Sequence, residues 1–245
     1  MSGPDRPVAI VTAIPEELDA ILSRTRDVRR DPYRFFVGRL GATAVVLAAT
    51  GDGLRRAARG AAALCDVHRP RAFVGMGVAG ALTDELTPFD ILVARRVIDA
   101  SSEAPAPDGE LSARALALPG SREAALVTAR GPVVSRGARE ALAASSGETG
   151  PAAVDMESAA WAREASDRRI PYAILRVISD GAADELPGYL SECMDSNGSI
   201  RRSSVALRAL TQPGSIRSLL KMRSRVREAS ARLAAFVEHL LAKGV

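Results

Sequence analysis

Short apolar segments alternate with alanine-rich segments of helical spacing along most of this chain, and this alternation constrains the fold more than any other feature. Strands separated by helices in this way are typical of a mostly parallel sheet. The segments expected to form strands are residues 8–12, 35–37, 43–48, 72–75, 91–100, 125–128 and 172–178. The helices are expected at residues 16–24, 53–65, 136–145, 157–166 and beyond residue 186.

The length of the chain agrees with a single α/β domain. A chain of 245 residues buries roughly three quarters of its unfolded surface when it folds as one unit. Neither an internal repeat nor a linker interrupts it, and residues 101–110 are predicted to form a surface loop. We therefore predict one domain over residues 1–245, a three-layer α/β/α fold with a central mixed, mostly parallel twisted sheet. A basic helical extension is expected from about residue 186.

Composition argues against several classes of protein. The chain contains no run of about 18 apolar residues, and its start has no signal-peptide pattern, so we expect a cytoplasmic protein. Cys65 and Cys193 are too few and too far apart for a disulfide framework or a zinc site. With only two histidines as further ligands, we expect no metal and no other cofactor.

Acidic residues flank a predicted helix and strand in the second half of the chain. Ser179 and Asp180 follow an apolar strand, so they are expected at the carboxyl edge of the sheet, where ligands bind in open α/β folds. Asp155 and Glu157 precede the helix before that strand. Two carboxyl groups delivered to one site suit acid–base chemistry on a sugar.

Four pieces of sequence occur in order along the chain. They are the amino-terminal strand and helix with Glu17, the glycine-rich segment 75–82, Met156 with Glu157, and Arg176 three residues before Ser179 and Asp180. Together they resemble the superfamily of purine nucleoside phosphorylases and 5′-methylthioadenosine/S-adenosylhomocysteine nucleosidases. That resemblance implies a nucleoside as the ligand.

The resemblance implies a role for each acidic residue near the carboxyl edge. Asp180 would protonate the purine at N7 with Ser179 steadying it, and Glu157 would bind the ribose 2′- and 3′-hydroxyls. The alternatives are structural. Asp180 would then cap the turn that follows it, and Glu157 would cap the helix that it precedes.

Glu17 distinguishes hydrolysis from phosphorolysis. Phosphorylases of the family carry a phosphate-binding loop after the first strand, whereas this chain has an Ile-Pro-Glu-Glu segment there. A carboxylate about 4 Å from a phosphate charge would cost about 4 kcal/mol at an effective dielectric constant near 20. Hydrolysis is therefore favoured, with Glu17 as the base that activates water and Arg176 assisting. Phosphorolysis remains the alternative, as does a solvated first helical turn at Glu16 and Glu17.

The glycine-rich segment is expected to turn tightly after a central strand. Gly77 and Gly80 would permit that turn and expose backbone N–H groups. Val78, Ala79 and Gly80 would then line the substrate site. Where many relatives have a hydroxyl donor this chain has an apolar segment with Val78, which predicts a different 5′ group on the nucleoside.

Other expected substrate contacts are Asp155, Met156, Pro132 and Val133. Pro132 aligns with an aromatic residue that stacks on the purine in relatives, so stacking is expected to be weaker here. Trp161 is predicted to belong to the core rather than to contact the ligand.

The carboxyl-terminal region is strongly basic. Between residues 200 and 227 there are eight Arg or Lys residues and no Asp or Glu. A solvated helical face explains such a pattern, and attraction to anionic lipid headgroups at the inner membrane surface is the functional alternative. This ending resembles the hopanoid-associated nucleosidase subgroup, which implies a nucleoside with a lipid 5′ group as a candidate substrate.

Two classes of function remain after these comparisons. One is a purine-nucleoside N-ribohydrolase, and the other is a non-catalytic membrane- or ligand-binding module on the same fold. Nucleic-acid binding is disfavoured because no aromatic residues are interleaved with the basic run. Relatives in the superfamily are usually homo-oligomers, so we expect a homo-oligomer, with a dimer favoured.

Overall fold

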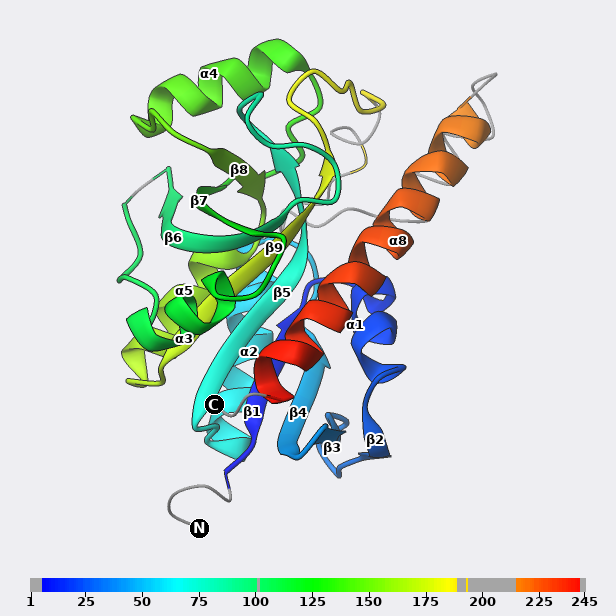
Figure 1. Ribbon diagram of the computed structural model, residues 1–245, viewed down its shortest axis with the longest axis vertical. Helices are drawn as coiled ribbons and strands as arrows, with labels where there is room; N and C mark the ends of the chain where they lie inside the picture. The colour runs from blue at the N-terminus through cyan, green and yellow to red at the C-terminus, as the bar shows by residue number, and fades with distance from the viewer. Residues whose placement is uncertain (1–5, 101, 189–192, 194–214, 243–245) are drawn as a thin grey trace.

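The structure is a computed structural model that describes residues 6–100, 102–188, 193 and 215–242 (Figure 1). The described residues contain nine strands and six helices. The strands are β1 (Val8–Thr12), β2 (Arg26–Arg30), β3 (Phe36–Leu40), β4 (Thr43–Ala49), β5 (Ala72–Ala81), β6 (Ile91–Asp99), β7 (Ser121–Thr128), β8 (Ala152–Asp155) and β9 (Tyr172–Asp180). The helices are α1 (Pro15–Leu22), α2 (Leu54–His68), α3 (Gly109–Leu116), α4 (Arg136–Ser146), α5 (Ser158–Asp167) and α8 (Ser215–Ala242).

All nine strands form one mixed sheet in the order β2-β3-β4-β1-β5-β8-β7-β6-β9. β1 pairs in parallel with β4 and β5, and β5 in parallel with β9. The predicted mixed α/β class is confirmed. β9, the last strand in this order, also pairs with β5 in the middle of the sheet. As a result, β5, β8, β7, β6 and β9 close into a small barrel, which we did not predict.

The length of β5 explains this closure. β5 pairs with β9 from Phe73 to Gly80, and its last two residues, Gly80 and Ala81, also pair with β8. The register with β9 shifts between Ala79 and Gly80. Such a bulge bends a strand and increases its twist, which lets one strand serve two neighbours at its end.

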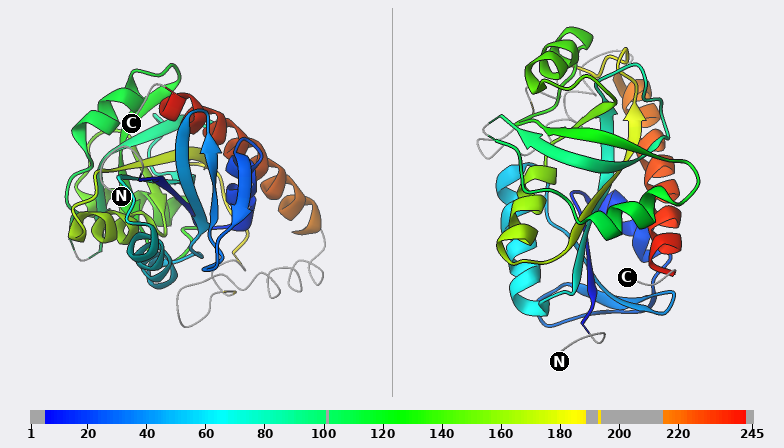
Figure 2. Two further views of the ribbon diagram at one scale, coloured as in Figure 1. Left: turned by 90° about the horizontal axis from the view of Figure 1, so that it is seen from below. Right: turned by 60° about the vertical axis from the view of Figure 1, so that its left-hand side comes forward.

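Helices cover both faces of the sheet, as the three-layer prediction requires (Figure 2). Alternate residues of a strand point to opposite faces, because the side-chain period of a strand is two. Ala9 and Val11 of β1 pack in the cluster with α2 and α5, whereas Val8 and Ile10 pack in the cluster with α1, α3 and α8.

The carboxyl-terminal half of α8 packs beside α1, and its Leu233, Val237 and Leu240 are buried. The amino-terminal part projects from the body, and Leu220 is 62% exposed. Among the described helices, none is long and apolar enough to cross a membrane. The expected basic extension is only partly described, since Arg201 and Arg202 lie outside the described residues.

Three elements were missing from the sequence-based prediction. β2 is exposed along its whole length and has no apolar alternation, so only its pairing with β3 makes it a strand. β8 has just four residues. α3 begins inside the segment predicted to be a loop, because the Asp108 side chain accepts a hydrogen bond from Leu111 N–H and caps the helix.

Candidate active site

The carboxyl ends of three neighbouring strands meet at one place. Asp155 is the last residue of β8 and Asp180 is the last residue of β9. Gly80 of β5 is the register partner of both Val154 and Asp180. The predicted position of Asp180 at a strand end is thus found in the structure. The short strand β8 brings Asp155 to the same edge.

Arg176 of β9 lies next to two carboxyl groups of the predicted site. Its guanidinium pairs with Asp155 and lies 3.7 Å from Glu157 Oε2. It also lies 4.8 Å from the centre of the Trp161 ring, which is fully buried in the core as predicted. In the described part of the chain, no group of three or more potential ligands is arranged to hold a metal ion.

Glu157 is the N-cap residue of α5, but the side chain that caps the helix is that of Asp155. The Asp155 carboxylate accepts hydrogen bonds from Ser158 N–H at 3.1 Å and from Thr128 Oγ1 at 2.8 Å. The Glu157 carboxyl turns to another helix and accepts from Gly53 N–H at 2.8 Å. Gly53 is the N-cap of α2 and has φ of 84°, a conformation that favours glycine. The structural alternative for Glu157 is therefore wrong.

Burial changes the protonation of Glu157. Burial first, and then the neighbouring Asp155, raise the pKa of Glu157 to about 8, although Arg176 and Gly53 N–H oppose the rise. A carboxyl group with this pKa carries a proton at neutral pH. It can then donate a hydrogen bond to a ligand as well as accept one.

Glu17 is buried and lies between β1 and β5. Its carboxyl group accepts hydrogen bonds from the N–H groups of Ala13 at 3.0 Å, Ile14 at 3.2 Å and Val78 at 2.9 Å. Burial raises the pKa of Glu17, and Arg176 and these N–H groups partly offset that effect. Because Glu17 is only 2% exposed, a solvated helical turn does not describe it.

The glycine-rich segment continues β5, so the predicted turn after a strand is wrong. Its glycines are needed for another reason, which is close approach. A Cβ atom at Gly77 would collide with the Arg176 guanidinium and lie 2.8 Å from Glu17 Oε1. A Cβ atom at Gly80 would lie 2.8 Å from Asp180 Oδ2 and 2.9 Å from an Arg139 nitrogen. Each glycine leaves room for an arginine and a carboxyl group.

Asp180 is held by two side chains. Ser179 Oγ lies 2.5 Å from Asp180 Oδ1, and an Arg139 nitrogen lies 2.5 Å from Asp180 Oδ2. The turn after β9 is capped by Asp184, which accepts from Gly181 N–H at 3.1 Å. The interpretation of Asp180 as a turn cap is therefore wrong.

Arg139 was not identified from the sequence. It lies on α4 and is 1% exposed. Arg139, Leu142 and Ala143 share one helical face, because residues three and four apart are neighbours on a helix, and Leu142 and Ala143 pack against buried residues. A charged residue on the apolar face of a predicted helix was the signal that could have revealed it.

The remaining predicted contacts differ in how closely they approach the carboxyl groups. Val78 joins the cluster through its backbone, since its C=O accepts from Arg176 at 3.4 Å, and Ala79 C=O lies 3.3 Å from Ser179 Oγ. Val133 packs in the small apolar cluster beside β7 and β8. Pro132 and Met156 are half-buried, and among the described residues no side-chain hydrogen bond joins them to the carboxyl groups.

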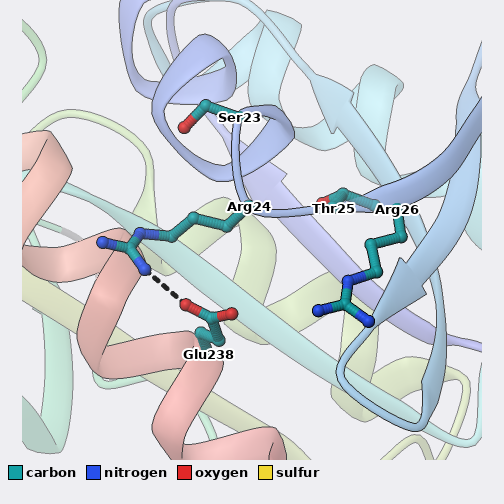
Figure 3. Close-up of a pocket in the computed structure, with 5 residues that line it drawn as sticks. All are labelled: Ser23, Arg24, Thr25, Arg26 and Glu238. Carbon is teal, nitrogen blue, oxygen red and sulfur yellow. Dashed lines mark hydrogen bonds and ion pairs between the residues drawn. The ribbon is translucent and has the colours of Figure 1, made fainter.

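A surface pocket elsewhere is lined by polar and charged residues. It has a volume of about 460 Å³ and is formed by Ser23, Arg24, Thr25, Arg26 and Glu238 (Figure 3). Arg24 and Glu238 form an ion pair across it. The pocket shares none of its residues with the carboxyl cluster, so we place the candidate active site at the cluster.

Comparison with known protein families identifies the superfamily to which this chain belongs. The family model described as the Phosphorylase superfamily matches residues 7–211. The chain belongs to this superfamily. Its glycine-rich strand and all of its clustered carboxyl groups lie within the matched region.

Curated relatives of this phosphorylase-superfamily chain include nucleosidases. The 5′-methylthioadenosine/S-adenosylhomocysteine nucleosidase of Treponema pallidum is 27% identical, with 86% of this chain and 95% of the relative aligned. A protein of the same name from Mycobacterium tuberculosis is 38% identical over 94 residues, which cover 37% of each chain. The second match therefore spans only about a third of the relative.

Solved structures show the same fold as this superfamily member. The 5′-methylthioadenosine/S-adenosylhomocysteine nucleosidase of Helicobacter pylori has a TM-score of 0.77 at 19% identity, covering 99% of this chain and 100% of the other. Futalosine hydrolase of the same organism has a TM-score of 0.75 at 18% identity, covering 97% and 98%. At these identities the likeness establishes the fold.

Proposed function

We propose that this protein hydrolyses the N-ribosidic bond of a purine nucleoside, with adenine favoured as the base and with a modified 5′ group on the ribose. The names of its curated relatives support this reaction class. So does the gathering of Glu17, Glu157 and Asp180 at neighbouring strand ends. Acid–base chemistry on a sugar requires carboxyl groups on both sides of the bond that breaks.

The observation that carries the proposal is the buried carboxyl group of Glu17. It accepts hydrogen bonds from three backbone N–H groups, two between β1 and α1 and one on β5. A phosphate bound in this place would need the same donors. Burial raises the pKa of Glu17, which makes its carboxylate a stronger base. Water is therefore the favoured nucleophile, and phosphorolysis is the alternative that the test below addresses.

In the proposed reaction, the bond between ribose C1′ and purine N9 breaks, and its electron pair passes to the purine. Asp180 donates a proton to N7, so that the base leaves as a neutral molecule. Water adds to C1′, and the proton that it loses passes to Glu17. Glu157 binds the ribose hydroxyls, and Arg176 orients Glu157 and Asp155. The products are a free purine and a free sugar.

The 5′ group is the least constrained part of the substrate. Val78 of β5 contacts Glu17 through its N–H group. Because its side chain is apolar, it favours an apolar 5′ substituent over a hydroxyl. Candidates are the methylthio group of methylthioadenosine, the homocysteine of S-adenosylhomocysteine, and a lipid attached to adenosine. Futalosine belongs in the same panel, because a structurally similar protein is named a futalosine hydrolase.

Incubation with this panel tests the proposal. We expect purine release in phosphate-free buffer, with the free sugar as the second product and a rate that does not rise when phosphate is added. Chromatography of base and sugar provides the measurement. A ribose 1-phosphate product formed only with phosphate would establish phosphorolysis instead. Ligand binding without release of purine would favour the non-catalytic alternative.

A second proposal is that the projecting part of α8 contacts anionic lipid. The exposed Lys221, Arg223 and Arg227 lie there together with the exposed Leu220. Each basic residue near an anionic membrane contributes about 1 kcal/mol to binding. The proposal supports a lipid 5′ group, since substrate and surface would then lie in the same membrane.

Replacement of Lys221, Arg223 and Arg227 by Ser tests this contact. Sedimentation with phosphatidylserine vesicles should weaken at least tenfold, and wild-type binding should weaken as salt rises because the Debye length contracts to about 8 Å. The matched control replaces Arg26, Arg29 and Arg30 of the exposed strand β2, which changes the charge equally. Equal weakening of vesicle binding in both triple variants would mean that the net charge of the protein, and not α8, causes the binding.

A further inference from the structure

Arg139 has no role in the reaction proposed above, yet it is bound to that reaction's acid. One of its terminal nitrogens pairs with Asp180 Oδ2. The other donates hydrogen bonds to Ala81 C=O at 3.0 Å and Gly181 C=O at 3.1 Å. A single guanidinium thus connects α4 with the end of β5, the end of β9 and the carboxyl group between them.

The order of these groups places Arg139 behind Asp180. The Arg139 side chain is 1% exposed, whereas the Asp180 side chain is 12% exposed. A ligand that reaches Asp180 from solvent therefore meets the carboxyl group and not the guanidinium. Any effect of Arg139 on a bound purine must pass through Asp180.

The pair is built at an energetic cost. Burying the Arg139 guanidinium removes its hydration, and replacing a buried charged group and its partner by apolar residues is often neutral or stabilising. In addition, Arg139 Nε is buried with no hydrogen-bond partner among the described residues. Gly80 leaves the space for the pair, because a Cβ atom there would press on both partners. Stability alone does not account for such an arrangement.

We infer that Arg139 is a positioning residue for the hydrolysis proposed above, which fixes the Asp180 carboxyl group and stabilises the negative charge that it gains when its proton passes to the purine. The inference rests on the proposed function. As the N7–H bond forms and the Asp180 O–H bond breaks, the electron pair of that O–H bond stays on Asp180. A guanidinium already in place then meets the new charge without reorganisation.

A double-mutant cycle with Asp180 tests the inference. Arg139→Met should lower kcat by roughly 10- to 100-fold with KM changed less than threefold, because the lost interaction strengthens in the transition state. Asp180→Asn should lower kcat by roughly 10² to 10⁴. The kcat of the double variant should lie within twofold of the kcat of Asp180→Asn, since Arg139 acts only through Asp180. Arg139→Lys should recover part of the lost rate.

Arg136→Met is the matched control, because Arg136 lies about one turn away on α4 and forms an exposed ion pair with Glu140. It should retain wild-type kcat. If Arg139→Met does not fold, the comparison of the double variant with Asp180→Asn, together with Arg139→Lys, still decides the question. Additive losses in the double variant, or wild-type kcat in Arg139→Met, would overturn the inference. Absence of purine release by the wild type would instead overturn the proposed function.

Discussion

At the scale of single residues, the site holds more buried carboxyl groups than positive charges. Arg176 faces Asp155, Glu157 and Glu17, and all four are buried. Moving a carboxylate out of water favours its neutral form, and a like charge nearby adds to that effect. The excess of negative charge is reduced because the pKa of Glu157 is raised to about 8, which favours its neutral form.

This retained proton predicts a pH dependence of stability. The pKa of Glu157 rises from 4.5 in the unfolded chain to about 8, so between these values the folded protein binds more protons. Stability from this group is fully present below pH 4.5 and is lost as pH rises through 8. Glu157→Gln should therefore make the fall in unfolding free energy over this range shallower.

Urea unfolding at pH 5, 6.5 and 8 measures this slope. Glu140→Gln is a suitable control, because Glu140 is exposed and its replacement should leave the slope unchanged. A slope in Glu157→Gln equal to that of the wild type would mean that Glu157 is already ionised in the folded protein at pH 5.

At the scale of elements, β5 organises the site. It pairs with β1 and β9 along most of its length and reaches β8 at its end. Two of its three glycines face an arginine and a carboxyl group: Gly77 faces Arg176 and Glu17, and Gly80 faces Arg139 and Asp180. A strand with side chains at these positions would separate the arginines from the carboxyl groups that they hold.

Gly77→Ala is predicted to damage the site more than the fold. The added methyl group would displace the guanidinium of Arg176 and the carboxyl group of Glu17, neither of which has free space. We expect purine release to fall by at least about 10², since misplacement by about 1 Å has effects of this size. The unfolding free energy should fall by about 1–3 kcal/mol.

Gly137→Ala provides the control for that substitution. Gly137 is exposed on α4, and a Cβ atom there would meet nothing within 4 Å. The change should stabilise the helix by up to about 1 kcal/mol and leave the rate of purine release unaltered. Wild-type rates in both variants would show that the close approach at Gly77 is unimportant.

At the scale of the whole molecule, closure of the sheet distributes stability unevenly. β5 and β9 lie within the barrel and have neighbours on both sides, whereas β2 is exposed throughout and pairs with β3 alone among the described strands. Backbone groups on an edge strand lack a partner on one side, and opening such a strand exposes little apolar surface. The barrel should therefore be the last part of the sheet to open.

Amide hydrogen exchange followed by mass spectrometry tests this order. Peptides from β5 and β9 should exchange slowest, with protection approaching the free energy of global unfolding, and those from β2 should exchange fastest. Equal protection of β2 and β5 would contradict the view that closure concentrates stability in the barrel.

Local patterns were sufficient to predict much of this architecture. β1 has the predicted bounds, and Asp180 ends an apolar strand as expected, because periodicity and burial are encoded in neighbouring residues. β2 was missed, since an exposed edge strand needs no apolar pattern. The glycine-rich segment was misread as a turn, because glycine favours a turn and also permits close packing within a strand.

The alternation of strands and helices, the superfamily resemblance and the acidic residues of the site can be read from the sequence, since each of these depends on short stretches of chain. Tertiary structure alone decided which charges meet. Arg139 and Asp180 are 41 positions apart, and Glu157 and Gly53 are 104 apart. Such contacts depend on how strands pair and helices dock, so closure of the sheet, the raised pKa of Glu157 and the guanidinium behind Asp180 arise only when the chain is folded.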